Sequence, residues 1–388
     1  MFKVCIDGTP VRGKLSGIGF YTLSLIDSLY KLQEQEEFKL EIYFHPSLKN
    51  WLSKKLSTPD LLNKYSSVSV FPIPVTIANI LAKYPNPILS YFESHLDKPD
   101  ILHGTDHYVY PYRKSRKIMT IHDLTFLKYP QYSTTIVQGY LERIKSCLQW
   151  TDLIITFSNN TKQDIIEYLG VKPEQIYITS EASRYHSNYL KSYSIEQLKN
   201  SINYDFSIPY FLLVSTLEPR KNIITLIKAF DYLKEKHKIP HNLVLIGQKG
   251  WKYQSIFEAI ENSKYQQDIK HLNYLSDELL ALFYNQTDVF IYPSFYEGFG
   301  LPVLEAMTLG SPVITSNTSS LPEVAGEAAI LVNTSDMLEL AEAILKVISD
   351  SQLRNELIKK GQERAKLFSW ERTAQETFTA YQLLINRR

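Results

Sequence analysis

Short apolar runs alternate with longer amphipathic segments along the whole chain. The short runs, rich in Val, Ile, Leu and Phe, predict buried strands, and segments with apolar residues every three or four positions predict helices. The predicted strands lie at 2–7, 40–45, 67–73, 100–104, 117–123, 152–158, 175–179, 210–216, 241–248, 269–275, 288–294, 312–316 and 328–333. This alternation indicates an α/β protein whose parallel sheets are covered by helices.

The length of the chain predicts more than one domain, since 388 residues exceed the ~150 of a typical single unit. A polar stretch rich in Ser, Asn and Tyr interrupts the pattern, and we place the domain junction there. The predicted divisions are a Rossmann-like domain at 1–182, a linker at 183–209, a second Rossmann-like domain at 210–369 and a final helix at 370–388. That last helix is long enough to cross back to the first domain.

A strand-to-helix turn near residue 300 carries two carboxylates, Glu297 and Glu305, with Gly298 and Gly300 beside them. Pro302 stands where the first turn of a helix tolerates proline. Such a turn presents backbone N–H groups and a positive helix end, which suit phosphate or sugar oxygens. The two carboxylates can face one cleft and accept from the hydroxyls of a sugar diol. Either one alone is better explained as a loop or helix-dipole charge, but the combination favours a sugar-nucleotide site.

Arg220 and Lys221 follow the strand predicted at 210–216 and begin a helix. Ligands of open parallel sheets bind at this end of the strands. Two cations at a helix N-terminus are electrostatically unfavourable unless an anion lies nearby, because the helix end is already positive. The pair therefore predicts a diphosphate site, with a solvated basic turn as the alternative.

Two histidines also stand at predicted strand ends, His103 and His122. A histidine at such a position can donate to a sugar hydroxyl or act as acid or base. A structural role is the alternative for both, and it is favoured for His103.

Glycines at Gly13, Gly17 and Gly19 precede a helix near the N-terminus. Their distance from the strand and Thr22 in place of a third glycine do not match the dinucleotide fingerprint. The loop is better explained by a close approach of its backbone to phosphate, or by a flexible connection.

Composition excludes several classes of protein. A formal net charge of +1 argues against a nucleic-acid binder, and no Asp-x-Asp or His/Cys/Asp cluster has metal spacing.

The two cysteines, Cys5 and Cys147, lie in apolar segments, which fits a reducing compartment, and the N-terminus lacks the pattern of a signal peptide. No apolar run is long enough to span a membrane. We expect a cytoplasmic protein, with peripheral contact at the inner membrane face left open.

Four segments resemble retaining glycosyltransferases of family four: EGFGLPVLEAM, TLEPRKN, SGIGFYT and IHDLTFLKYP. The resemblance implies the GT-B fold, in which two doubly wound Rossmann-like domains face a cleft, the first on the acceptor side and the second binding the donor. The resemblance implies that Glu305 binds the nucleotide ribose and that Arg220 and Lys221 hold the donor diphosphate. It implies that Glu297 and the backbone of Phe299, Gly300 and Leu301 hold the transferred sugar, and that His122 reaches the C6 side of this sugar. Gly17 and Gly19 would lie close to the phosphates, and the backbone near Tyr274 and Leu275 would contact the base. One departure is Ser16-Gly17 where many members have paired glycines.

The resulting prediction is a metal-independent, retaining hexosyltransferase without a cofactor. The donor would be UDP-glucose, another UDP-hexose or GDP-mannose, and the acceptor a glycan or lipid-linked saccharide in polysaccharide biosynthesis. A nucleotide-sugar epimerase on the same fold and a non-catalytic nucleotide-sugar binder remain as alternatives.

Overall fold

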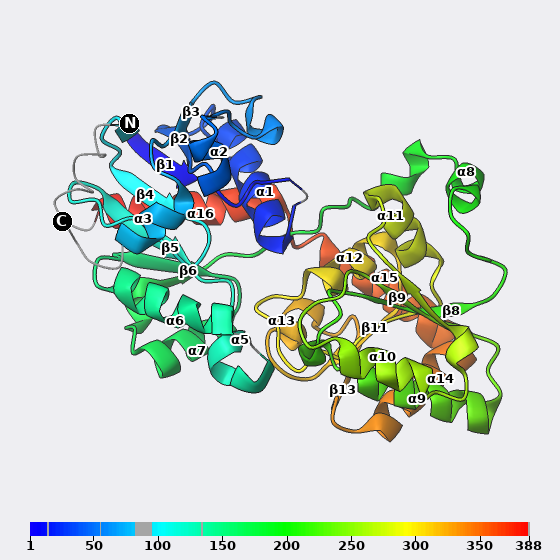
Figure 1. Ribbon diagram of the computed structural model, residues 1–388. Coiled ribbons are helices and arrows are strands. Elements are labelled where there is room, and N and C mark those ends of the chain that lie inside the picture. The colour runs from blue at the N-terminus through cyan, green and yellow to red at the C-terminus, as the bar shows by residue number, and fades with distance from the viewer. Residues whose placement is uncertain (14, 55, 82–94, 133–134, 387–388) are drawn as a thin grey trace. The chain divides into compact units, whose positions relative to one another are not determined.

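The computed structural model describes residues 1–13, 15–54, 56–81, 95–132 and 135–386 (Figure 1). The chain forms two compact units. The first comprises Met1–Pro130, Thr134–Glu181 and Ser369–Arg388, and the second comprises Gln131–Ser133 and Ala182–Phe368. The polar stretch 183–209 thus groups with the second unit, and the last helix groups with the first.

The first unit is built on a parallel sheet of seven strands in the order β3-β2-β1-β4-β5-β6-β7. The strands are β1 (Phe2–Asp7), β2 (Phe38–Phe44), β3 (Val68–Val70), β4 (Ile101–Gly104), β5 (Arg116–Thr120), β6 (Leu153–Thr156) and β7 (Ile176–Ile178). The helices are α1 (Gly17–Leu32), α2 (Leu48–Leu52), α3 (Val75–Leu81), α5 (Thr125–Lys128), α6 (Thr135–Leu148), α7 (Asn159–Leu169) and α16 (Trp370–Asn386). Strands β4 and β6 are buried along their whole length, as in sheets with helices on both faces.

Helix α16 packs on the first unit through aromatic side chains. The Phe378 ring stacks on Phe2 at 6.1 Å, and Trp370 meets Phe20 edge-on at 5.7 Å. In Figure 1 the red α16 runs beside the blue α1. The C-terminal residues therefore complete the hydrophobic core of the unit in which the chain begins.

The second unit has a parallel sheet of six strands in the order β10-β9-β8-β11-β12-β13. The strands are β8 (Tyr210–Val214), β9 (Asn242–Ile246), β10 (Ile269–Leu272), β11 (Val289–Tyr292), β12 (Val313–Ser316) and β13 (Ile330–Val332). The helices are α8 (Ile195–Asn200), α9 (Ile223–His237), α10 (Gln254–Glu261), α11 (Asp277–Gln286), α12 (Leu301–Leu309), α13 (Leu321–Ala325), α14 (Met337–Ser349) and α15 (Ser351–Ala365). Every predicted strand is present, and the doubly wound α/β prediction is confirmed for both units.

Both sheets reverse their strand order at the centre, between β1 and β4 in the first unit and between β8 and β11 in the second. At such a switch point the connections leave toward opposite faces, and ligands bind beyond the carboxyl ends of the flanking strands. Arg220 and Lys221 follow β8, and Glu297 follows β11. The fold thus places these three residues at the switch point of the second sheet.

Candidate functional site

Glu297 lies between two cations in the second unit. Lys221 Nζ donates to Glu297 Oε1 at 2.6 Å, and Arg220 Nη1 donates to Oε2 at 2.7 Å. Lys221 also donates to the hydroxyl of Tyr292 at 2.8 Å. The Glu297 and Lys221 side chains are both buried, so this ion-pair network is screened little by solvent.

A second carboxylate completes this network. Glu218, which is 2% exposed, accepts from Arg220 Nη2 at 2.7 Å and from Nε at 3.2 Å through the same oxygen. Two carboxylates therefore balance two cations. We predicted that Arg220 and Lys221 require a bound anion, but the chain itself supplies the anions through Glu218 and Glu297. The charge of Arg220 and Lys221 is therefore neutralised within the chain, and their diphosphate role rests on the family resemblance.

The charges in this network shift the pKa of Glu297. Burial raises this pKa, but the nearby Arg220 and Lys221 outweigh burial and lower it to about 2. Glu297 is therefore ionised at neutral pH, with both oxygens accepting from cations. Such a carboxylate is suited to orienting donors, and its lone pairs are poorly available for attack on carbon.

The turn that carries Glu297 is held by two serines and a glycine. Ser319 Oγ accepts from Glu297 N at 2.9 Å, and Ser320 Oγ lies 2.7 Å from the Phe299 carbonyl oxygen. Gly300 has φ +117°, and a Cβ there would meet Leu321 at 2.7 Å. Only glycine satisfies both conditions, which accounts physically for the glycine just before α12.

Glu305 belongs to a different network. It is 2% exposed within α12, and its Oε1 accepts from Arg184 Nε at 2.7 Å while Oε2 accepts from the Tyr284 hydroxyl at 3.1 Å. Arg184 Nη1 also pairs with Asp277 Oδ1 at 3.1 Å. The sequence reasoning did not single out Arg184, because an isolated arginine in a polar stretch carries no periodic signal.

The two residues expected near the base follow β10. Tyr274 is 51% exposed, and Leu275 is partly buried in the loop that leads to α11. Residues 269–275 were predicted as one strand, but β10 ends at Leu272. Both residues therefore present loop backbone at the carboxyl end of a strand.

His122 lies at the end of β5 in the first unit. Its Nε2 is 2.8 Å from the carbonyl oxygen of Thr105, and because a carbonyl can only accept, Nε2 carries the proton. Nδ1 of the neutral ring is then an acceptor. Burial lowers the pKa of His122, which keeps the ring neutral. An edge-on contact with the Tyr21 ring and a tilted contact with the Phe157 ring, each with centroids 5.1 Å apart, fix its orientation.

His103 has a structural role, as the sequence analysis favoured. It is fully buried, its Nδ1 lies 2.7 Å from the Tyr381 hydroxyl of α16, and its Nε2 lies 2.9 Å from Thr120 Oγ1. Burial lowers its pKa to about 3. This histidine therefore joins the C-terminal helix to the sheet in its neutral form.

The N-terminal glycine loop leads directly into α1. Ser16 caps the helix by accepting from Gly19 N at 3.2 Å. A Cβ on Gly19 would lie 2.9 Å from the Pro10 carbonyl oxygen, whereas Gly17 has open space around it. The loop packing thus requires Gly19, while Gly17 leaves the first turn of α1 uncovered.

Asp7 is a further residue at the switch point of the first sheet that the sequence reasoning passed over. It ends β1, its Oδ1 accepts from Thr9 N at 2.8 Å, and burial raises its pKa to about 6. An acidic residue at a strand end was the available signal. The neighbouring β4 is tied to it, since Thr105 Oγ1 donates to the Asp7 carbonyl oxygen at 2.8 Å.

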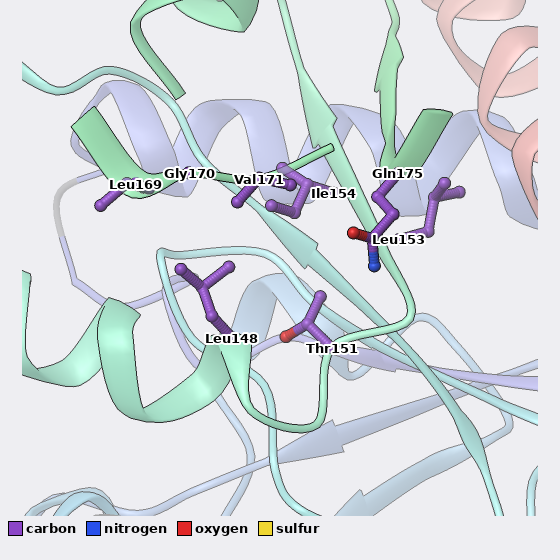
Figure 2. A pocket seen from close by; sticks show the side chains of 8 residues that line it. All are labelled: Leu148, Thr151, Leu153, Ile154, Leu169, Gly170, Val171 and Gln175. Atoms are coloured by element: carbon purple, nitrogen blue, oxygen red, sulfur yellow. The ribbon is translucent and has the colours of Figure 1, made fainter. Parts of the chain in front are cut away.

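A small cavity of about 170 Å³ lies elsewhere in the first unit (Figure 2). It is lined by Leu148, Thr151, Leu153, Ile154, Leu169, Gly170, Val171 and Gln175. These residues surround the amino end of β6, the sheet edge opposite His122. The cavity is therefore not part of the candidate site.

Two features are absent from the residues that the structure describes. Among them, no group of three His, Cys, Asp or Glu side chains is placed to hold a metal ion. Of the helices within those residues, none combines the length and apolarity needed to cross a membrane.

Two models of known protein families match this chain. The model described as "Glycosyl transferases group 1" matches residues 194–364, and the model described as "Glycosyltransferase Family 4" matches residues 39–180. The first range includes both ion-pair networks except Arg184, and the second includes His122.

Curated relatives include O-antigen chain mannosyltransferase B of Escherichia coli, which is 32% identical over 98% of this chain and 100% of its own length. The MMP alpha-(1->4)-mannosyltransferase of Mycolicibacterium hassiacum is 28% identical over 64% of this chain and 58% of its own length.

Solved structures of the same fold include the sucrose-phosphate synthase of Thermosynechococcus elongatus, with TM-score 0.75, 20% identity and coverage of 100% of both chains. Anabaena HepE in complex with UDP and glucose has TM-score 0.73 and 16% identity, with coverage of 99% of this chain and 100% of that one. These likenesses confirm the GT-B fold.

Proposed function

The chain belongs to glycosyltransferase family four, and from this premise we propose that it transfers mannose from GDP-mannose to a hydroxyl of a growing polysaccharide. The observation that carries this proposal is the match to the Escherichia coli O-antigen mannosyltransferase, at 32% identity over 98% of this chain. The second relative named above is also a mannosyltransferase. The structure with UDP and glucose is only 16% identical to this chain, so it supports the fold and not a UDP donor.

The Glu297 network supplies the charge that such a reaction needs. As the bond from the anomeric carbon to the diphosphate breaks, negative charge grows on the departing oxygen, and fixed cations stabilise that charge without a metal. An ammonium has three N–H groups, of which Lys221 gives two to Glu297 and Tyr292. The third is available to a phosphate oxygen. In this proposal Glu297 keeps the cations in place before the donor arrives.

We propose that transfer retains the anomeric configuration through attack on the face that the diphosphate leaves. The bond from the anomeric carbon to the acceptor oxygen forms as the bond to the phosphate oxygen breaks, and the acceptor proton passes to that phosphate oxygen. A covalent route through Glu297 is disfavoured because Arg220 and Lys221 occupy both of its oxygens. Detection of a mannosylated Glu297 peptide by mass spectrometry would refute this scheme.

His122 is proposed to accept a hydrogen bond from a hydroxyl of the sugar. Its Nε2–H is directed to Thr105, which leaves Nδ1 as an acceptor for a hydroxyl such as that on C6. The family resemblance places His122 on the C6 side of the sugar. The ring would then position the sugar and would not donate to it.

The test is a transfer assay with the purified full chain. GDP-mannose or UDP-glucose is incubated with a mannose-terminated oligosaccharide, and the mass of the product is measured. A gain of one hexose from GDP-mannose is expected, and transfer only from UDP-glucose would refute the proposed donor. Incubation of each donor alone distinguishes the rivals, since an epimerase would convert it without acceptor and a non-catalytic binder would leave both substrates unchanged.

A further inference from the structure

Arg184 contacts the carboxylate that the family resemblance assigns to the nucleotide ribose. Its Nε donates to Glu305 Oε1 at 2.7 Å, and its Nη1 pairs with Asp277 Oδ1 at 3.1 Å. Residue 184 falls between the two ranges matched by the family models, so neither includes it.

The two contacts fix the guanidinium plane. Glu305 is 2% exposed in the middle of α12, and Asp277 is the first residue of α11. A planar guanidinium held by carboxylates on two different helices has little rotational freedom. Arg184 therefore also fixes the orientation of the Glu305 carboxylate that it contacts.

Tyr284 holds the other oxygen of Glu305. Its buried hydroxyl donates to Oε2 at 3.1 Å, so each oxygen of Glu305 has one donor among the residues that the structure describes. A carboxylate oxygen can accept about two hydrogen bonds. One accepting position is then left on each oxygen, and a pair of adjacent acceptors matches the two adjacent hydroxyls of a ribose.

We propose that Arg184 is a positioning residue for ribose recognition: it orients the Glu305 carboxylate so that both oxygens accept from the 2′- and 3′-hydroxyls of the nucleotide. This inference rests on the proposed function, since it requires a nucleotide donor. A purely structural role, in which Arg184 only joins the segment before β8 to α11 and α12, is the competing explanation. The two roles differ in whether Arg184 affects discrimination between nucleotides with and without the ribose hydroxyls.

The experiment is isothermal titration of the full chain with GDP and with 2′,3′-dideoxy-GDP, and in parallel with UDP and its dideoxy analogue. The wild type is expected to prefer the ribonucleotide by about tenfold, the effect of one or two charge-assisted hydrogen bonds. In Arg184→Gln we expect this preference to fall to within about twofold while the affinity for the dideoxy nucleotide is retained. Arg354→Gln is the matched control, since it removes an arginine of the same unit that pairs with Asp288 and not with Glu305, and it should keep the preference.

Each outcome decides between the roles. A preference that survives in Arg184→Gln, or an equal loss of affinity for both nucleotides, overturns the inference and leaves the proposed function intact. If Arg184→Gln does not fold, Arg184→Lys keeps the charge without the Nε–H and should give an intermediate preference, and a wild-type preference in that variant overturns the inference. Failure of the wild type to bind either nucleotide would refute the proposed function together with this inference.

Discussion

Glu297 and Glu305 are both buried carboxylates from one short segment, yet the protein neutralises them differently. Glu297 lies in a turn and pairs with two cations that are adjacent in sequence, Arg220 and Lys221. Glu305 lies inside a helix and pairs with one cation, Arg184, together with the neutral hydroxyl of Tyr284. Glu297 can release one of its two cations to a substrate and stay paired with the other, whereas Glu305 depends on Arg184 as its counter-charge.

The balance of charge in the two networks differs in the same sense. Around Glu297, the carboxylates of Glu297 and Glu218 match the two cations. Around Glu305, Asp277 adds a second carboxylate to a single arginine, and one negative charge is left over. Under the proposed function, the first network suits an anionic diphosphate and the second suits neutral hydroxyl donors such as a ribose diol.

The largest difference should appear in turnover. In Glu297→Gln we expect the kcat for mannosyl transfer to fall by about 10²–10³, because the cations lose the anchor that holds them for the transition state. The affinity for GDP, measured by titration, should stay within about twofold, since Arg220 and Lys221 remain. The matched control is Glu258→Gln, an exposed carboxylate of the same unit, which should keep normal turnover. Normal turnover in Glu297→Gln would remove Glu297 from the mechanism.

Acid should protonate Glu297 and remove the stability that its charge contributes. Its pKa in the folded protein is about 2 against an ordinary value of 4.5, so its stabilising contribution is present above pH 4.5 and is lost as the pH falls toward 2. The shift corresponds to a contribution on the order of 3 kcal/mol. In urea unfolding, the wild type should therefore lose more stability than Glu297→Gln between pH 4.5 and pH 2. Parallel curves for the two proteins would show that the ion pairs contribute no net stability.

The number of cations around each carboxylate should also decide stability at neutral pH. Arg184→Met leaves Glu305 without a counter-charge, and we expect a loss of about 2 kcal/mol, below the usual cost of breaking a buried pair because Arg184 is partly exposed. Lys221→Met still leaves Glu297 paired with Arg220, and because burial already disfavours the charged form of Lys221, the loss should be smaller, about 1 kcal/mol. The measurement is the free energy of unfolding in urea. A larger loss in Lys221→Met would reverse the comparison.

The smallest expected effect concerns nucleotide affinity. In Arg220→Ala the affinity for GDP should fall about tenfold, since one charge-assisted contact to the diphosphate is lost. Lys228→Ala removes an exposed cation of α9 and serves as the matched control, with unchanged affinity expected. If mannose 1-phosphate binding fell while GDP binding did not, the cations would act on the sugar side of the donor alone.

The alternating pattern of the chain was sufficient to predict both sheets, because strands buried on two faces are apolar over their whole length and helices on their surfaces are amphipathic. The glycines before α12 likewise predicted the strand-to-helix turn at that position. Gly300 combines a positive φ with contact against Leu321, and a local backbone requirement of this kind leaves a local trace in the sequence.

Long-range pairs left no such trace. Arg184 is 121 residues from Glu305, and Lys221 is 76 residues from Glu297. The partner of a charge depends on which strand ends the sheet order brings together, and the strand order is not encoded in any short segment. For the same reason the tautomer of His122 is set by the carbonyl of Thr105, which lies 17 residues away in the sequence.

The sequence by itself therefore determined the fold class, the approximate positions of the strands along the chain and the residue types that could bind a sugar nucleotide, since these follow from local periodicity and from backbone geometry. Only the tertiary structure decided which carboxylate faces which cation, and so which anions stand next to Arg220 and Lys221 and which arginine holds Glu305. The physical reason is that burial and charge pairing depend on distances between residues far apart along the chain, and the packing of each unit sets those distances.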